Sequence, residues 1–339
     1  MSFKNLVGQN ELRSLLFSAL TENKLSHSVL LTGPSGSGKK SWGRALSMAV
    51  LCSCRVAGEP CMECISCRSF LNGNHPDFFE LSPDGRNIKI DQIRSLRQKF
   101  YLQGSKKVCM INQAEVMTAE ASSSLLKLLE DPPDDLHFIL LARQPRLLFD
   151  TIVSRCQRYV LKPLDCSDIT RLLLDKKQLS EEKASLVARI SGGLPGYAFE
   201  LADDEHFEGR FEEVKTLAYN LATGCDSAQQ LLSWARYLSD REDLTNFLEL
   251  LGMIYRDGMI QNLCVEKSMN WFADIDSVSL EDSVMLINSV IYELNNTNVN
   301  RRLLLEKLLV LLQRRFSKCQ KSSGFGSSRL EKPIILNPV

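Results

Sequence analysis

The chain has 339 residues, which is too long for one small hydrophobic core and predicts two or three domains. Its 41 basic and 41 acidic residues cancel, which excludes a polycation that binds nucleic acid or anionic membranes through net charge alone. The N-terminal residues have no signal-peptide pattern, and no run approaches the roughly 18 apolar residues of a membrane span. We therefore expect a cytoplasmic protein without membrane contacts.

Short apolar runs punctuate the first 163 residues. The sequences HSVLLTG (27–33), KKVCMIN (106–112) and HFILLA (137–142) each have the length of a buried strand. Such continuous apolar runs are typical of parallel sheets, whose strands are covered on both faces.

Helical patterns separate these runs. DQIRSLRQKFYL (91–102) has Asp91 as a plausible N-cap, and AEASSSLLKLLED (119–131) stops at Pro132 and Pro133. Strands that alternate with helices predict an α/β fold, in which helices cover both faces of a parallel sheet.

The first apolar run leads into a glycine-rich stretch, GPSGSGKK (33–40). It matches the phosphate-loop pattern GxxxxGK[ST] through Lys39, which would reach the phosphates of a nucleotide, and fails at Lys40. Its glycines, which let backbone N–H groups converge on phosphate oxygens, are Gly33, Gly36 and Gly38. Lys40 offers Mg²⁺ no hydroxyl oxygen, and Ser41 cannot replace it because one residue along a helix turns the side chain by about 100°.

Five cysteines crowd between residues 52 and 67, which in a reducing compartment indicates a metal site rather than disulfides. Two consecutive CxxC steps and a fourth thiol predict a structural, tetrahedral Zn²⁺ site with four protein ligands: Cys52, Cys61, Cys64 and Cys67. Cys54 and, less strongly, His75 compete with Cys52 as the fourth ligand. Free or redox-active thiols are the alternative.

The run KKVCMIN is followed by two amides where a nucleotide-hydrolysing site needs carboxylates. A working site has Asp to hold Mg²⁺ and Glu to polarise the attacking water. This chain has Asn112 and Gln113. Together with Lys40, these residues predict a site that binds no Mg²⁺ and does not hydrolyse ATP.

No apolar run of strand type follows residue 164. Residues 164–206 read as a small helical unit, and residues 207–318 contain about five longer amphipathic helices. This bundle either forms only its own core or also packs on other subunits. The Gly/Ser-rich segment 319–339 is expected to be a flexible tail.

Seven stretches resemble bacterial clamp-loader subunits of the AAA+ superfamily in their order and spacing. They are VGQNELRSLL, SHSVLLTGPSGSGKK, NHPDFFEL, IKIDQIRSL, AEVMTAEASSSLLKLLEDPP, SRC and, near the end, NVNRRLLLEKLLVLL. The resemblance implies an AAA+ P-loop core at 1–163 with a zinc module at about 50–70, a helical lid at 164–206 and a helical collar at 207–318. It also implies a DNA polymerase III hetero-pentamer with gamma/tau-type ATPase subunits and a delta subunit, which loads a sliding clamp on primed DNA.

The chain keeps Lys39 and the loop glycines but departs from the ATPase members of this family at several other positions that handle the nucleotide. Its departures are Lys40, Asn112, Gln113, Arg143 and Gln144 near a sensor position, and Pro195 or Gly196 in place of a lid arginine. The resemblance therefore implies a non-hydrolysing stator subunit, with ATP or ADP binding left open. The alternative is an ATP-hydrolysing gamma/tau-type subunit.

The motif SRC (154–156) acquires meaning only through the resemblance. In this family it presents an arginine finger to ATP bound by the neighbouring subunit, which implies that role in trans for Arg155. A planar guanidinium suits the charge that spreads over the γ-phosphoryl oxygens.

A third possibility, a zinc-containing DNA binder that recognises one sequence, has weaker support. The cysteine-rich segment lacks interleaved basic and aromatic residues, and the later helices have no evident basic stripe.

Overall fold

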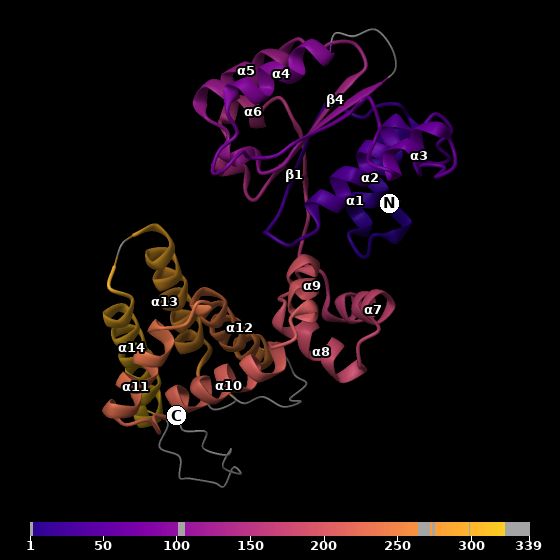
Figure 1. The fold of residues 1–339 in the computed structure, drawn as a ribbon. Helices are drawn as coiled ribbons and strands as arrows, with labels where there is room; N and C mark the ends of the chain where they lie inside the picture. Colours follow the sequence, from indigo (N-terminus) through magenta and orange to yellow (C-terminus); the bar gives the residue numbers. More distant parts are fainter. Residues whose placement is uncertain (1–2, 101–105, 264–271, 273–274, 298, 323–339) are drawn as a thin grey trace. The chain divides into compact units, whose positions relative to one another are not determined.

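The computed structural model describes residues 3–100, 106–263, 272, 275–297 and 299–322 (Figure 1). The chain forms two compact units. Unit 1 comprises the residues up to 185 and residues 193–199, and unit 2 comprises residues 186–192 and those from 200 onward. The three-part division at 163 and 206 stays a prediction. Of the predicted tail, residues 323–339 lie outside the described residues.

Unit 1 is built on a parallel sheet, as the sequence predicted, which has five strands in the order β2-β3-β4-β1-β5 (Figure 1). Its strands are β1 (Ser28–Thr32), β2 (Phe78–Leu81), β3 (Lys107–Ile111), β4 (Leu136–Ala142) and β5 (Gln157–Val160). The three predicted apolar runs contain β1 and β3 and nearly all of β4. Because β3 lies between β2 and β4, the end of β3 is next to side chains of β2.

Helices cover both faces of this sheet (Figure 1). Because successive side chains of a strand point to opposite faces, Val29 and Leu31 join one hydrophobic core and Leu30 joins the other. The first core includes η1 (Phe3–Asn5), α1 (Asn10–Thr21), α2 (Lys39–Leu51) and α3 (Ile65–Leu71). The second includes α4 (Ile90–Phe100), η2 (Ala114–Val116), α5 (Ala119–Glu130) and α6 (Asp150–Val153).

The prediction that Asp91 is the N-cap of α4 is wrong. The helix begins at Ile90, so Asp91 lies in its first turn. A carboxylate there is still favourable, because it faces the positive end of the helix dipole. Helix α5 ends at Glu130, before the two prolines, as predicted.

Helix α2 is almost wholly buried and spans about 20 Å at 1.5 Å per residue. Its middle lies unusually close to the sheet, since a Cβ atom at Gly43 would be 2.9 Å from Met110 Sδ and 3.1 Å from Leu141 Cδ2. The helix begins at Lys39, in the phosphate loop, and Cys52 is its C-cap. One rigid element therefore bears the first residues of both candidate sites.

Beyond the sheet the described residues are mainly helical. A short η3 (Pro145–Leu147) precedes α6, and residues 166–203 form α7 (Cys166–Lys177), α8 (Glu181–Ile190) and α9 (Pro195–Asp203). Five longer helices follow, as expected: α10 (Phe207–Thr223), α11 (Ala228–Ser239), α12 (Leu244–Leu263), α13 (Ser277–Asn296) and α14 (Arg301–Ser322).

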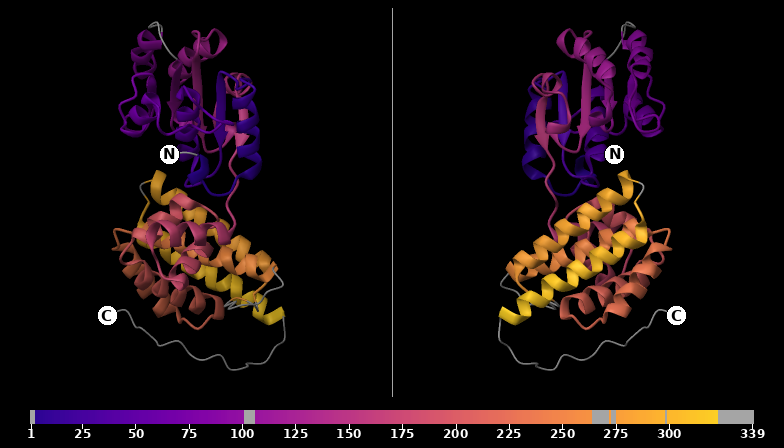
Figure 2. Two further views of the ribbon diagram at one scale, coloured as in Figure 1. Left: turned by 90° about the vertical axis from the view of Figure 1, so that its right-hand side faces the viewer. Right: turned by 90° about the vertical axis from the view of Figure 1, so that its left-hand side faces the viewer.

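The helices of unit 2 pack around aromatic side chains. Tyr255 is fully buried, contacts the rings of Phe272 and Phe316, and donates a hydrogen bond to Ala218 O at 3.3 Å. Helices α13 and α14 lie side by side (Figure 2). Within the described part of the chain, no helix is both long and apolar enough to cross a membrane.

Candidate functional site

The phosphate loop (33–40) connects β1 to α2 and includes the first two residues of that helix. Gly36 and Gly38 have φ angles of +75° and +86°, which only glycine adopts without strain. The first helical hydrogen bond of α2 is donated by Trp42 N–H to Gly38 O at 3.0 Å. Among the described residues nothing accepts from the N–H groups of Lys39 and Lys40, so these donors are available to an anion.

Lys39 folds back over the loop. Its ammonium donates to Gly33 O and to Pro34 O, both at 2.7 Å. Burial lowers the pKa of Lys39, while the carboxylate of Glu115 acts in the opposite direction. The predicted phosphate-binding lysine therefore lies in the loop and is partly desolvated.

Lys40 is paired with a carboxylate from the neighbouring strand. Its ammonium lies 2.7 Å from Glu80 Oε1 in β2, and Asn112 Nδ2 donates to the same oxygen at 2.9 Å and to Ser82 Oγ at 2.9 Å. Arg44 Nη1 contacts the second oxygen, Glu80 Oε2, at 2.8 Å. Burial alone would raise the pKa of Glu80, but these partners together hold it below the ordinary value.

These residues do not fit Mg²⁺. A hydroxyl at 40 and a carboxylate at 112 would supply oxygen ligands, whereas here an ammonium and an amide NH₂, both donors, face the same oxygen of Glu80. That carboxylate is already shared by Lys40 and Arg44.

Beyond β3, a different carboxylate is buried. Gln113 has φ +51°, a left-handed conformation that starts η2. Two residues later, the side chain of Glu115 is only 3% exposed and its Oε1 accepts from Arg143 Nε at 3.0 Å. Its Oε2 has no hydrogen-bond partner. No pattern in the sequence singles out Glu115, because it lies outside the position where a water-polarising Glu is expected.

A small cavity of about 130 Å³ adjoins the loop. Its lining includes Ser37, Trp42, Pro195 and Phe199. Helix α9 begins at this wall, where Gly196 N–H donates to Gly36 O at 2.7 Å. Pro195 and Gly196, which replace the expected lid arginine, thus contact the loop with backbone and ring atoms only.

Arg155 follows α6 and is partly exposed. Its Nη2 lies 2.6 Å from Glu130 Oε1 and its Nη1 donates to Thr151 O at 3.0 Å. The side chains of Arg155 and Glu130 are 37% and 46% exposed. Exposed pairs of this kind contribute at most about 1 kcal/mol, so a stronger anion could displace Glu130.

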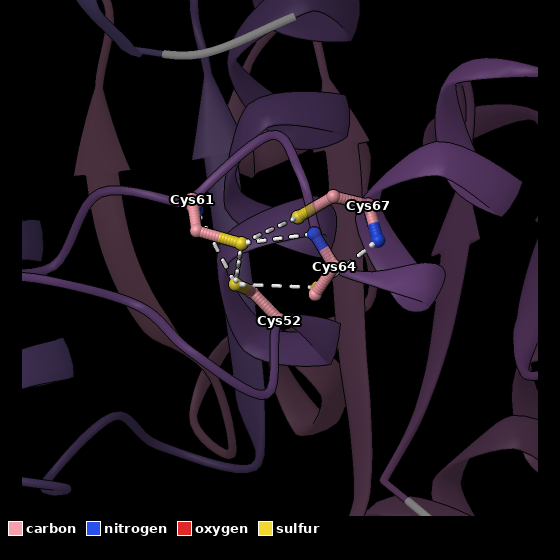
Figure 3. Close-up of side chains that lie close together, drawn as sticks. All are labelled: Cys52, Cys61, Cys64 and Cys67. Carbon is pink, nitrogen blue, oxygen red and sulfur yellow. Dashed lines mark hydrogen bonds between the residues drawn. The ribbon is translucent and has the colours of Figure 1, made fainter.

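Four cysteines converge beside α2 and α3 (Figure 3). Their sulfur atoms all lie within 4.8 Å of one another, and the group is Cys52, Cys61, Cys64 and Cys67. Cys54 is exposed and lies outside this group, and His75 Nε2 is bonded to Ser66 Oγ at 2.8 Å.

The spacing of the sulfur atoms fits a tetrahedral metal ion. Thiolates at about 2.3 Å from Zn²⁺ would be about 3.8 Å apart. The Cys52–Cys61, Cys52–Cys64 and Cys61–Cys67 sulfur distances are 3.6, 3.9 and 4.0 Å.

Backbone donors also point at these sulfur atoms. The N–H groups of Cys61, Cys64 and Cys67 donate to Sγ of Cys52, Cys61 and Cys64 at 3.3, 3.3 and 3.4 Å, respectively. Burial raises the pKa of Cys52, whereas at Cys64 the N–H donors outweigh burial and lower the pKa to about 6. N–H donors favour the thiolate form that binds metal.

Comparison with known proteins identifies relatives over most of the chain. Residues 8–165 match a family model described as DNA polymerase III, delta subunit. DNA polymerase III subunit delta' of Bacillus subtilis is 31% identical over 321 residues, which cover 90% of this chain and 96% of that protein. Subunit delta' of Pseudomonas aeruginosa is 30% identical over 306 residues, 84% of this chain and 91% of that protein.

Related proteins include a subunit of another kind and a solved structure. DNA polymerase III subunit tau of Bacillus subtilis is 32% identical over 282 residues, 80% of this chain but 49% of that protein. A gamma subunit-related protein of Thermotoga maritima has a TM-score of 0.43 and 22% identity, and the match covers 89% of this chain and 99% of that one.

The parallel P-loop sheet and these relatives define the class: a clamp-loader subunit of DNA polymerase III with an AAA+ fold. Within that class, the delta' subunits of Bacillus subtilis and Pseudomonas aeruginosa are at least 30% identical to this chain, and the matches cover 96% and 91% of their length. The chain belongs to the delta' family of DNA polymerase III.

Proposed function

We propose that this chain is a non-hydrolysing stator of a bacterial DNA polymerase III clamp loader, which loads sliding clamps on primed DNA during replication. One observation carries the proposal: Lys40 and Asn112 direct donors, not oxygen ligands, at Glu80. Without Mg²⁺ and a positioned carboxylate base, phosphoryl transfer lacks its main sources of charge stabilisation and water activation.

Arg155 is proposed to act in trans, as an arginine finger on ATP held by a neighbouring subunit. Its exposed guanidinium and the weak pair with Glu130 support this role, because the side chain can change partners at small cost. A planar fork of donors matches phosphoryl oxygens better than an ammonium does.

The proposed partners are gamma/tau-type ATPase subunits and a delta subunit in a cytoplasmic hetero-pentamer. Residues 207–318, which include α10–α13 and most of α14, are proposed as the collar, 164–206 as the lid, and 1–163 as the core. Sliding clamp and primed DNA would be reached through the assembly.

Zn²⁺ is proposed for the four cysteines. The sulfur spacing and the N–H donors support it, and four protein ligands leave no open position, so the ion would stabilise the fold of residues 50–70 rather than act in catalysis.

The competing function is an ATP-hydrolysing gamma/tau-type subunit. It is favoured by the 32% identity to subunit tau and by Lys39 in a loop that matches the phosphate-loop pattern up to position 40. The two functions differ in what the purified chain does with ATP. Turnover by the chain alone that Lys39→Ala abolishes would establish the competing function.

The test of the proposed function is reconstitution with ATPase and delta-type subunits, followed by DNA-stimulated ATP turnover and clamp loading. Arg155→Ala is expected to lower turnover at the neighbouring site by about 10³-fold, and Arg155→Lys is expected to restore little because it lacks the planar fork. Arg158→Ala, at a nearby exposed arginine of β5, is the matched control and should behave as wild type.

The outcomes separate the two parts of the proposal. Unchanged turnover with Arg155→Ala in an intact complex would show that Arg155 is not the finger. Failure of the wild-type chain to join the complex would contradict the stator role itself.

A further inference from the structure

The residues at the phosphate loop do not fit Mg²⁺, but they still fit an anion. We propose that this loop binds the diphosphate of a nucleotide without a divalent cation, with the Lys40 ammonium in the role that Mg²⁺ has in hydrolysing P-loop proteins. This inference concerns nucleotide held by the chain itself and is independent of the role of Arg155.

The net charge of the site supports the replacement of Mg²⁺ by the Lys40 ammonium. In a hydrolysing site, Mg²⁺ and the Asp that holds it together contribute one net positive charge. Here Lys40 and the neutral Asn112 contribute the same net charge, while Arg44 balances Glu80. The loop therefore keeps the charge that a diphosphate requires, although the ion is replaced by a side chain.

The contacts of Glu80 hold Lys40 in place. One carboxylate oxygen accepts from Lys40 at 2.7 Å and the other contacts Arg44 at 2.8 Å. Arg44 is itself positioned by cation–π contacts, with its guanidinium 5.6 Å from the Phe70 ring centroid and 5.8 Å from that of Phe78. An ammonium has three protons, so the contact with Glu80 leaves two for a phosphate.

The loop also offers donors to the anion. The N–H groups of Lys39 and Lys40 have no acceptor among the described residues, as noted above. Independently, Ser37 is only 4% exposed and its Oγ has no hydrogen-bond partner, although Ser37 lines the cavity beside the loop. A buried hydroxyl without a partner is costly, and a bound phosphate oxygen would satisfy it.

Calorimetric titration of the full-length chain with ADP tests this inference. Two buffers are compared, one with Mg²⁺ and one passed over a chelating resin, because a soluble chelator would also strip the cysteine site. We expect the wild-type dissociation constant to agree within about twofold between them, since no ion takes part.

Three variants sharpen the test. Lys40→Thr should weaken ADP binding in metal-free buffer by about tenfold to a hundredfold, as expected for a lost charged hydrogen bond. Lys40→Thr combined with Asn112→Asp should recover affinity only when Mg²⁺ is added. Lys24→Thr, at an exposed lysine that also pairs with a glutamate, is the matched control and should bind as wild type.

Three results would overturn the inference. They are wild-type binding that requires Mg²⁺, no binding of ADP in either buffer, and metal-free binding that Lys40→Thr leaves unchanged. Circular dichroism of each variant establishes that the chain is folded, so a loss of binding is assigned to the site.

Discussion

The two ends of helix α2 differ in what they retain. At its C-terminal end, Cys52 joins three other cysteines whose sulfur atoms are spaced for a metal ion. At its N-terminal end, Lys39 keeps its place in the phosphate loop, but Lys40 and Asn112 have replaced the oxygen ligands. The C-terminal end of α2 thus has a full set of four possible metal ligands, whereas the phosphate loop at its N-terminal end lacks the oxygen ligands for Mg²⁺.

The two ends of α2 differ because they have different tasks. If the cysteines hold Zn²⁺ as proposed, every copy of the chain would need the ion to stabilise residues 50–70, which expose Val56 and Ile65. Under the proposed function, ATP hydrolysis would be left to other subunits of the assembly. The phosphate-loop end can therefore change its chemistry while the backbone of the loop is kept.

The largest effect is expected at the cysteine end. Cys52→Ser should abolish stoichiometric zinc and lower the free energy of unfolding of unit 1 by at least about 3 kcal/mol, because the ion's binding energy contributes to folding. Metal content by mass spectrometry and a thermal unfolding curve measure both. Cys54 lies outside the group, so Cys54→Ser is the control and should retain zinc. If Cys54→Ser lost zinc and Cys52→Ser kept it, Cys54 would be the fourth ligand.

A smaller effect is expected at Arg44, which links the two ends. Arg44→Ala loses the pair with Glu80 and the contacts with Phe70 and Phe78, and should cost about 2 kcal/mol in denaturant unfolding. Arg44→Lys keeps the charge but not the planar stacking, so it should fall between Ala and wild type. Equal free energies of unfolding for wild type, Arg44→Ala and Arg44→Lys would show that the contacts of Arg44 do not stabilise the fold.

At the phosphate-loop end, the pH dependence of stability that Glu80 causes should be smaller than the effect of Arg44→Ala. Burial works against ionised Glu80, but Lys40, Asn112 and Arg44 outweigh it and lower its pKa. The native chain then binds fewer protons than the unfolded chain near this pKa, so the stabilising contribution of Glu80 is present above the unfolded pKa and lost as pH falls through the lowered one.

The comparison of wild type with Glu80→Gln isolates this response. Their difference in unfolding free energy should narrow as pH is lowered from about 5.5 to 3, since the two side chains become alike in charge. Glu11→Gln, at an exposed glutamate, is the control. A difference that stays constant with pH would contradict the lowered pKa.

The smallest change in stability is expected at Lys39. Lys39→Ala removes two hydrogen bonds to loop carbonyls but also relieves a buried ammonium, so the free energy of unfolding should change by less than about 1 kcal/mol. A loss as large as that of Cys52→Ser would mean that both ends of α2 are structural.

Local signals account for what the sequence predicted. The apolar runs of β1, β3 and β4 and the glycines of the loop are each specified by a few adjacent residues. The cysteine group is specified almost as locally, because α3 begins at the second CxxC step. These signals suffice for the three central strands and for the candidate residues of the phosphate loop and the cysteine group.

The site residues that the sequence did not predict are those brought together by contacts between distant parts of the chain. Glu80 lies 40 positions from Lys40 and 32 from Asn112, and only the sheet order, with β2 beside β3, brings them together. A single glutamate in a strand carries no pattern of its own. Glu115 was missed for the same reason, since its partner Arg143 comes from the end of a different strand.

Gly43 gives the experimenter a single control over both sites. A Cβ atom there would lie 2.9 Å from Met110 Sδ and 3.1 Å from Leu141 Cδ2, so an added methyl group requires these side chains to move or α2 to shift. If α2 shifts, the cysteine group and the phosphate loop at its opposite ends are displaced together, although neither was altered. Covariation of zinc content and nucleotide affinity across substitutions at 43 would reveal how stiffly the helix transmits such a shift.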